Sequence, residues 1–195
     1  MNPHALIATV TSVGIIVLAF SGHVPTYRTA PVFLLPLLWL AYFLRRRLHL
    51  HPVHYALFAI ALLVHMLGTF GFYQQSFFGL SFDIYVHFYF AIPAALILER
   101  LFRHGLPGAT WWPRVAALMF MMGFGALHEI MEYGSYLLLG EERGMLKPST
   151  SYAFDTQRDL VNNLLGTLTA LTLSALAHAT RARRDAEAPH EPGEP

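Results

Sequence analysis

The sequence predicts an all-α membrane protein, a polytopic transmembrane helical bundle of about six spans. Two observations lead to this prediction. Hydrophobic residues make up 55% of the 195-residue chain and charged residues only 13%, whereas an ordinary soluble domain carries roughly 25% charged residues. In addition, the apolar residues gather in segments that approach the length of about 20 residues that a helix needs to cross the hydrocarbon core.

The same composition excludes several other classes of protein. A formal net charge of only +1 does not fit a basic nucleic-acid-binding protein, so no nucleic-acid partner is expected. The absence of Cys excludes a disulfide scaffold and a cysteine zinc site. The high apolar content excludes an intrinsically disordered chain. Membrane lipids are therefore the expected surroundings.

Six segments are candidate spans, and their order along the chain is Ala5–Phe20, Pro31–Leu44, Val53–Phe72, Asp83–Phe102, Pro113–Leu139 and Leu160–Ala179. The second is short and contains Pro36, so it is expected to be kinked, tilted or re-entrant. The first lacks the basic start and the cleavage site of a signal peptide, so it is expected to be retained. Residues 1–180 then form one transmembrane domain, and residues 181–195 form a disordered cytoplasmic tail rich in Glu, Pro and Ala.

The positions of the basic residues predict the orientation of the bundle. With six spans, one side carries Arg45, Arg46, Arg47, Arg100, Arg103, Arg114, Arg181, Arg183 and Arg184. The other side carries Arg28, Arg143, Lys147 and Arg158. The side richer in Arg is predicted to be cytoplasmic, which places both termini in the cytoplasm.

Five of the twelve acidic residues lie at or within the outer halves of the spans, namely Asp83, Glu129, Glu132, Asp155 and Asp159. Residues separated by three or four positions share a helix face. This spacing relates Asp83 to His87, His128 to Glu132, Glu129 to Glu132, and Asp155 to Asp159, and Asn163 extends the last face inward. His65 lies at a similar depth on the third span. Four helices are thus expected to present polar groups to one region of the membrane.

Such a cluster needs an explanation, because a charged residue at the centre of a span costs about 2.5–3.5 kcal/mol on insertion scales. Arg158 is the one fixed cation nearby in the sequence, so the carboxylates must take up protons, contact water or bind cations. Carboxylate oxygens and imidazole nitrogens suit a divalent metal such as Mn, Fe or Zn, or a harder ion such as Mg or Ca.

The chemistry of these side chains gives each residue of the cluster a predicted role. The predicted metal ligands are His65, His87, Glu132 and Asp159, followed by His128 and Asn163. The predicted catalytic residues are Glu129, as a general base, with Asp83 and Asp155, which would bind the ion directly or hold its ligands.

Three functional interpretations stay open at this point. The first is a metal-dependent hydrolase or group transferase that acts on an envelope lipid or a lipid-linked substrate. The second is a proton- or cation-coupled transporter, or a binding protein without turnover. The third is a purely structural polar core that locks the helices together. The sequence does not decide whether the protein is an enzyme, and it leaves the substrate and the oligomeric state open.

The order of the motifs also resembles a known family. The motifs are His65…Gly68…Gly71-Phe72-Tyr73, Asp83-x-x-x-His87-Phe88, Glu129-x-x-Glu132-Tyr133, and Asp155-Thr156-Gln157-x-Asp159-Leu160 followed by Gly166. Over residues 60–175 the chain resembles the YjdF-like bacterial inner-membrane proteins. It is more distantly similar to the VanZ-like membrane proteins, which are linked to glycopeptide (teicoplanin) resistance. The resemblance implies a multi-pass helical protein of the bacterial cytoplasmic (inner) membrane. It does not indicate which activity, if any, the protein has. It also implies a shared polar set, His65, Asp83, His87, Glu129, Glu132, Asp155 and Asp159.

Overall fold

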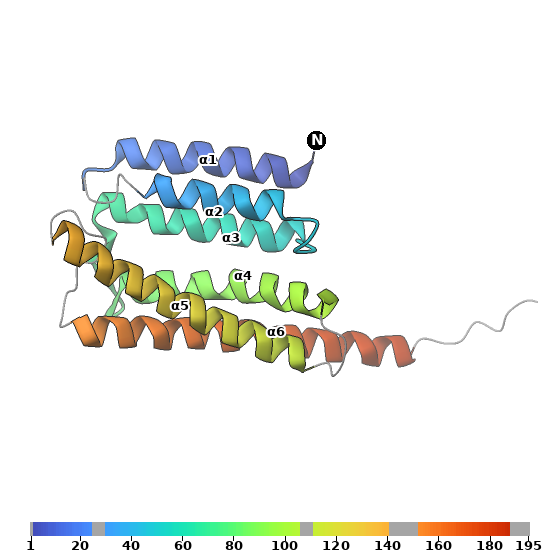
Figure 1. The fold of residues 1–195 in the computed structure, drawn as a ribbon. Coiled ribbons are helices and arrows are strands. Elements are labelled where there is room, and N and C mark those ends of the chain that lie inside the picture. Colours follow the sequence, from blue (N-terminus) through green and yellow to red (C-terminus); the bar gives the residue numbers. More distant parts are fainter. Residues whose placement is uncertain (1, 25–29, 106–110, 141–151, 188–195) are drawn as a thin grey trace, which may run out of the picture.

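The computed structural model describes residues 2–24, 30–105, 111–140 and 152–187. In these ranges the α-helices are α1 (Pro3–Ser21), α2 (Pro31–Phe43), α3 (Pro52–His65), α4 (Phe82–Gly105), α5 (Trp112–Leu139) and α6 (Tyr152–Glu187). Successive helices run in opposite directions along the bundle (Figure 1). The start of α1 and the end of α6 therefore lie at the same end of the bundle. The predicted all-α bundle is confirmed.

Five helical segments in the described ranges are long and apolar enough to cross a membrane: Pro3–Ser21, Pro52–Phe70, Phe82–Gly105, Trp112–Leu138 and Phe154–Glu187. Helix α2 is shorter, with 13 residues and Pro36 inside it. At a rise of 1.5 Å per residue it extends about 20 Å, less than the hydrocarbon core of about 30 Å. The second predicted span is thus a helix in the bundle but does not have the length of a full span.

Proline residues and local caps explain where several helices begin. Pro3, Pro31 and Pro52 each stand in the first turn of a helix, where the missing N–H costs nothing and the fixed φ angle favours the helix. The side chain of Asn2 caps α1 by accepting a hydrogen bond of 3.0 Å from the backbone N–H of His4.

The third predicted span does not continue as one α-helix to Phe72. The α-helix ends at His65, and the chain tightens into the 3₁₀ helices η2 (Met66–Phe70) and η3 (Phe72–Gln74). Gly71 joins them with a φ of 82°, a left-handed conformation that glycine adopts without steric cost. A short antiparallel hairpin, β1 (Ser76–Phe77) and β2 (Leu80–Ser81), then leads into α4.

Helix α6 differs from its prediction at both ends. It begins at Tyr152 instead of Leu160, so Asp155 and Asp159 lie on one continuous helix. It also continues through Glu187, so residues 181–187 are helical and not a disordered tail. This stretch is rich in Ala and Arg, which are strong helix formers. Residues 188–195 of the predicted tail lie outside the described residues.

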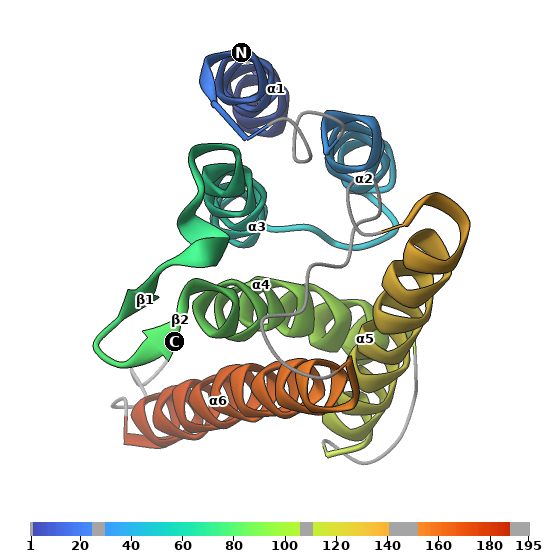
Figure 2. The same cartoon turned by 90° about the vertical axis from the view of Figure 1, so that its left-hand side faces the viewer.

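The end-on view shows α1, α2 and α3 on one side of the bundle and α4, α5 and α6 on the other (Figure 2). Helices α3 and α4 join the two halves. Buried side chains such as Ile15, Tyr55 and Leu62 form the core of the first half, and Ala91 and Ala170 belong to the core of the second.

Gly166 sets the distance between α4 and α6. A β-carbon at this position would lie 2.2 Å from the backbone oxygen of Phe88 and 2.9 Å from the β-carbon of Ala91. The two backbones can therefore approach closely only because position 166 carries no side chain. This contact places the first turns of α6 beside the first turns of α4.

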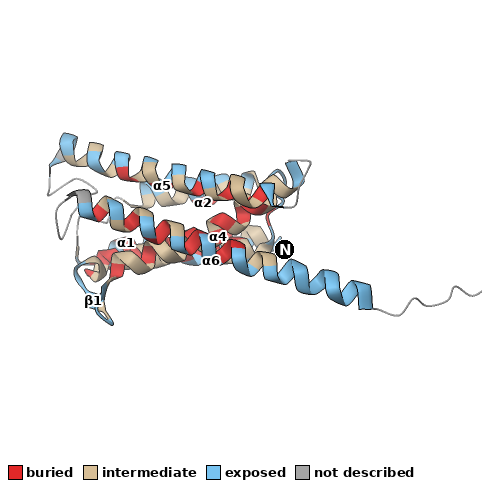
Figure 3. Ribbon diagram, turned by 90° about the horizontal axis from the view of Figure 1, so that it is seen from below, coloured by how far each residue is buried: buried red, intermediate tan, exposed pale blue. Residues whose placement is uncertain are grey.

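Much of the outer surface of the helices is apolar. Exposed and partly exposed residues cover the outside of α5 and α6, while buried residues follow the faces that meet inside the bundle (Figure 3). Large side chains such as Val10, Leu138 and Leu173 are more than half exposed. Such extensive apolar exposure is expected where lipid, and not water, surrounds the protein.

Candidate functional site

The residues predicted to form the site gather at one end of the bundle. This end lies away from the start of α1 and the end of α6. Helices α3 and α5 end there, and helices α4 and α6 begin there (Figure 1). Because neighbouring helices run in opposite directions, residues far apart in the sequence reach the same level. The charge asymmetry of the sequence predicts that this end faces the outer side.

Asp83, His87 and Asp159 form the centre of the site, which we call the Asp–His–Asp group. The Nε2 atom of His87 lies 3.5 Å from Oδ1 of Asp83, one turn earlier on α4. The same atom lies 3.6 Å from Oδ2 of Asp159 on α6. One ligand atom from each residue can be chosen so that all three lie within 4.8 Å of one another. The side chain of Asp159 is only 2% exposed. Two helices therefore bring together a largely buried set of possible metal ligands.

Arg158 lies against three carboxylates of the cluster. Its guanidinium donates hydrogen bonds of 3.1 Å to Asp83 and 2.5 Å to Asp155. Its Nε atom is 3.7 Å from Oδ1 of Asp159. Arg158 therefore neutralises part of the negative charge of these carboxylates. It also holds Asp155 beside the Asp–His–Asp group.

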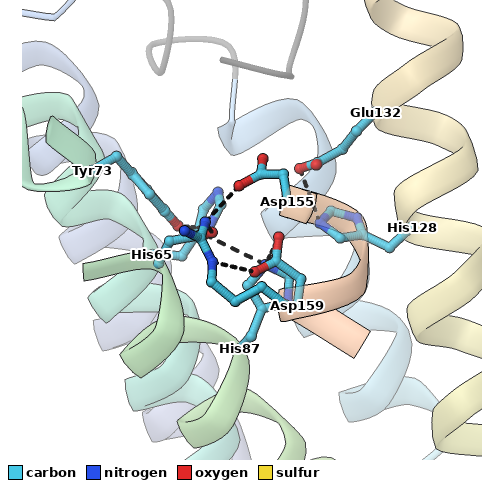
Figure 4. Close-up of polar contacts among 9 residues, drawn as sticks. His65, Tyr73, His87, His128, Glu132, Asp155 and Asp159 are labelled. Atoms are coloured by element: carbon cyan, nitrogen blue, oxygen red, sulfur yellow. Dashed lines mark hydrogen bonds and ion pairs between the residues drawn. The ribbon is translucent and has the colours of Figure 1, made fainter. Parts of the chain in front are cut away.

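Two further pairs surround this centre (Figure 4). The hydroxyl of Tyr73 and Nδ1 of His65 form a hydrogen bond of 2.6 Å. On α5, Nε2 of His128 lies 3.2 Å from Oε1 of Glu132. The ring of His128 is 5.9 Å from the ring of His87, so the α5 pair lies next to the Asp–His–Asp group without belonging to it.

Glu129 is a buried carboxylate that takes part in none of the ion pairs described above. Its residue is 5% exposed, its side chain interacts with that of Thr156, and neither oxygen makes a well-formed hydrogen bond to the described residues. Oδ1 of Asp159 also makes no hydrogen bond to the described residues, and its ion-pair contact with Nε of Arg158 is 3.7 Å long. Burying carboxylate oxygens with so few partners is costly, so a proton or a cation beside them would stabilise the site.

The structure divides the predicted metal ligands into two sets. His87 and Asp159 come together as expected, and Asp83 joins them as a third donor where the sequence suggested a catalytic or supporting role. His65 and Glu132 lie beside this group and pair with Tyr73 and His128. The amide of Asn163 faces Gly125 on α5, where an added β-carbon would lie 2.9 Å from Nδ2, so its contact is with the α5–α6 interface.

The sequence interpretation did not predict the contacts of two residues of the site. Tyr73 belongs to a motif but had no predicted role, and Arg158 was predicted to be the fixed cation near the carboxylates without a particular partner. The contacts of Arg158 had a signal in the sequence, because Arg158 lies three residues after Asp155 and one residue before Asp159. No spacing within one helix indicates that Tyr73 binds His65.

The fold and this site define a multi-pass helical membrane protein with a buried Asp–His–Asp group. Residues 3–180 match the family described as "Predicted membrane protein (DUF2238)", and the chain belongs to this family. Neither the curated proteins nor the solved structures contain a match to this chain. The family description states no activity, and the kinship with YjdF-like and VanZ-like proteins stays a prediction.

Proposed function

We propose that the Asp–His–Asp group binds a divalent metal ion, Mn²⁺, Fe²⁺ or Zn²⁺. The distances from Nε2 of His87 to the two carboxylate oxygens, 3.5 and 3.6 Å, carry this proposal. Two ligand atoms bound at about 2.0–2.2 Å in a tetrahedral site lie about 3.4 Å apart. The two separations from His87 thus match the ligands of one small ion, and the three ligand atoms, which lie within 4.8 Å of one another, come from two helices held together at Gly166.

The chemistry of the donors supports the same proposal. One imidazole nitrogen and two carboxylate oxygens suit a borderline or hard divalent ion. Burial makes the carboxylates poor places for unbalanced negative charge, and Oδ1 of Asp159 has no hydrogen bond to satisfy it within the described part of the chain. A cation at this point would balance the charge that Arg158 balances only in part.

We further propose that the protein is a metal-dependent hydrolase or group transferase acting on an envelope lipid or a lipid-linked substrate of the inner membrane. A bound ion would polarise an ester or phosphoryl oxygen or activate water. Glu129 is suited to accept a proton, because its carboxylate is buried within electrostatic reach of His87 and makes no well-formed hydrogen bond to the described residues. Arg158, 28% exposed, is placed to orient an anionic part of a substrate.

The first test is elemental analysis of the purified full-length protein by mass spectrometry. The wild type should carry about one equivalent of metal, and His87→Ala and Asp159→Asn should lose it. Glu132→Gln, which changes a neighbouring carboxylate outside the group, is the matched control and should keep it. Equal metal content in all four proteins, or no metal after reconstitution with each ion, would refute the metal site.

A second candidate function rests on Arg158. This guanidinium already contacts three carboxylates, so the cluster needs no metal ion to offset part of its negative charge. In that case the cluster either carries protons across the membrane or only stabilises the bundle. A proton carrier predicts a proton flux in proteoliposomes that depends on Glu129 and responds to pH. Substrate turnover in detergent, where no compartments exist, would favour the enzyme over this alternative.

A further inference from the structure

An apolar groove runs between α5 and α6 at the end of the bundle away from the Asp–His–Asp group. Its volume is about 330 Å³. Its walls include Val115 and Leu118 of α5, and Leu168, Leu171 and Ala175 of α6, with Arg114 at one end. From Leu168 to Leu176, its last lining residue on α6, the groove follows that helix for about 12 Å at 1.5 Å per residue. Leu168 is 42% exposed and Leu176 is 60% exposed, so the groove opens sideways to the surroundings of the bundle.

The Arg114 end of the groove carries an excess of positive charge. Nε of Arg114 lies 3.1 Å from Oε1 of Glu99, and Arg103 forms an ion pair with the same carboxylate. Two guanidinium groups thus share one carboxylate, which leaves one positive charge uncompensated. His178 of α6 lies near the same three residues and adds no negative charge.

The surroundings of Arg114 also match a membrane interface. Trp111 and Trp112, just before Arg114 in the chain, are 56% and 46% exposed, and exposed Trp residues are typical of the headgroup level. From this level the groove extends toward the middle of the bundle. A ligand that fits it has an anionic end at Arg114 and an apolar chain that points into the hydrocarbon core.

We propose that this groove binds one acyl chain of an anionic phospholipid, whose phosphate lies beside Arg114. Basic pockets between transmembrane helices on the cytoplasmic side bind anionic headgroups, and the positive-inside rule predicts that Arg114 lies on that side. The apolar lining excludes a polar metabolite as the main occupant. This site is separate from the Asp–His–Asp group and does not depend on its function.

Native mass spectrometry of the purified full-length protein in detergent tests the proposal. The protein is titrated with phosphatidylglycerol and with phosphatidylcholine of the same acyl chains. The wild type should bind phosphatidylglycerol more tightly. Arg114→Gln keeps the Glu99–Arg103 pair and removes one charge, so it should weaken phosphatidylglycerol binding about fivefold, which corresponds to about 1 kcal/mol. Ala175→Phe fills the groove and should weaken both lipids.

Matched variants keep the test specific. Arg46→Gln removes an exposed Arg of the same predicted side, and Val161→Phe adds a Phe to an outward position of α6 that is 53% exposed. Both should bind lipid as the wild type does. Where Ala175→Phe fails to fold by circular dichroism, Leu168→Phe tests the same groove from a partly exposed position. Equal affinity for the two lipids in the wild type, or groove-filling variants that bind like Val161→Phe, would refute the proposal.

Discussion

Replacing Arg158 with Gln separates a metal site from a purely structural core. The change removes the guanidinium that contacts Asp83, Asp155 and Asp159 and leaves their carboxylates in place. Breaking a buried ion pair by removing one partner costs about 3–5 kcal/mol. The Arg158 side chain is 28% exposed, so solvent screens part of the interaction. We therefore expect the metal-free protein to lose about 3 kcal/mol, the lower end of that range.

A metal ion should reverse most of this loss. Without the guanidinium, the Asp–His–Asp group has no competing cation, so its affinity for Mn²⁺ should rise. An ion present at 100 times its dissociation constant stabilises the folded state by about 2.7 kcal/mol. The Arg158→Gln protein with saturating Mn²⁺ should then be nearly as stable as the metal-free wild type.

The free energy of unfolding can be measured by SDS titration in mixed micelles, followed by circular dichroism, with and without Mn²⁺. Arg46→Gln, at an exposed position on the predicted cytoplasmic side, controls for the loss of one positive charge. The double variant Arg158→Gln/Asp159→Asn should no longer respond to the metal. A loss of about 3 kcal/mol that Mn²⁺ does not restore at any concentration would refute the metal site and favour the structural core.

Three further predictions concern the fold and its orientation. Gly166→Ala should destabilise the bundle by about 1–3 kcal/mol, because the added carbon meets the α4 backbone, whereas Gly123→Ala, with nothing within 4 Å, should be neutral or slightly stabilising. The same SDS titration measures both, and equal stabilities would contradict the close contact. Glu99→Gln should cost about 3–5 kcal/mol, since it leaves two guanidinium groups without their carboxylate, and a loss below about 1 kcal/mol would show a pair no stronger than one at a surface. Phe78→Cys, at the tip of the hairpin, should react with an impermeant maleimide on intact cells, and Arg46→Cys only after permeabilisation, whereas the reverse pattern would invert the orientation.

The relation between Asp83 and His87 could be predicted because it lies within one helix. A separation of four residues places both side chains on one face whatever the rest of the chain does. The same reasoning related His128 to Glu132, which lie 3.2 Å apart in the structure. Helix positions were likewise predictable from the length of the apolar segments, with two exceptions. The α-helix of the third span ends at His65, before the predicted Phe72, and the polar first turns and Arg-rich end of α6 hid its true length.

The membership of the Asp–His–Asp group could not be predicted in the same way. Asp159 reaches His87 because Gly166 lets α4 and α6 approach, and the sequence does not reveal which glycine has that role. His65 was predicted to lie near the cluster, but its hydrogen bond with Tyr73 depends on the left-handed turn at Gly71, which brings Tyr73 back to it. Pairing between helices depends on their relative rotation and distance, which side-chain packing decides.

The sequence by itself therefore determined that this is a multi-pass helical membrane protein in which five acidic residues and His65, His87 and His128 lie toward the same end of its helices. Composition and local helical spacing suffice for that, because burial in lipid requires long apolar segments and each helix repeats every 3.6 residues. Only the tertiary structure decided that Asp159 joins Asp83 and His87, and that Arg158 contacts Asp83 as well as the carboxylates of its own helix. These contacts between α4 and α6 join residues about 70 positions apart, and the close approach of two backbones at Gly166, not any local pattern, brings them within bonding distance.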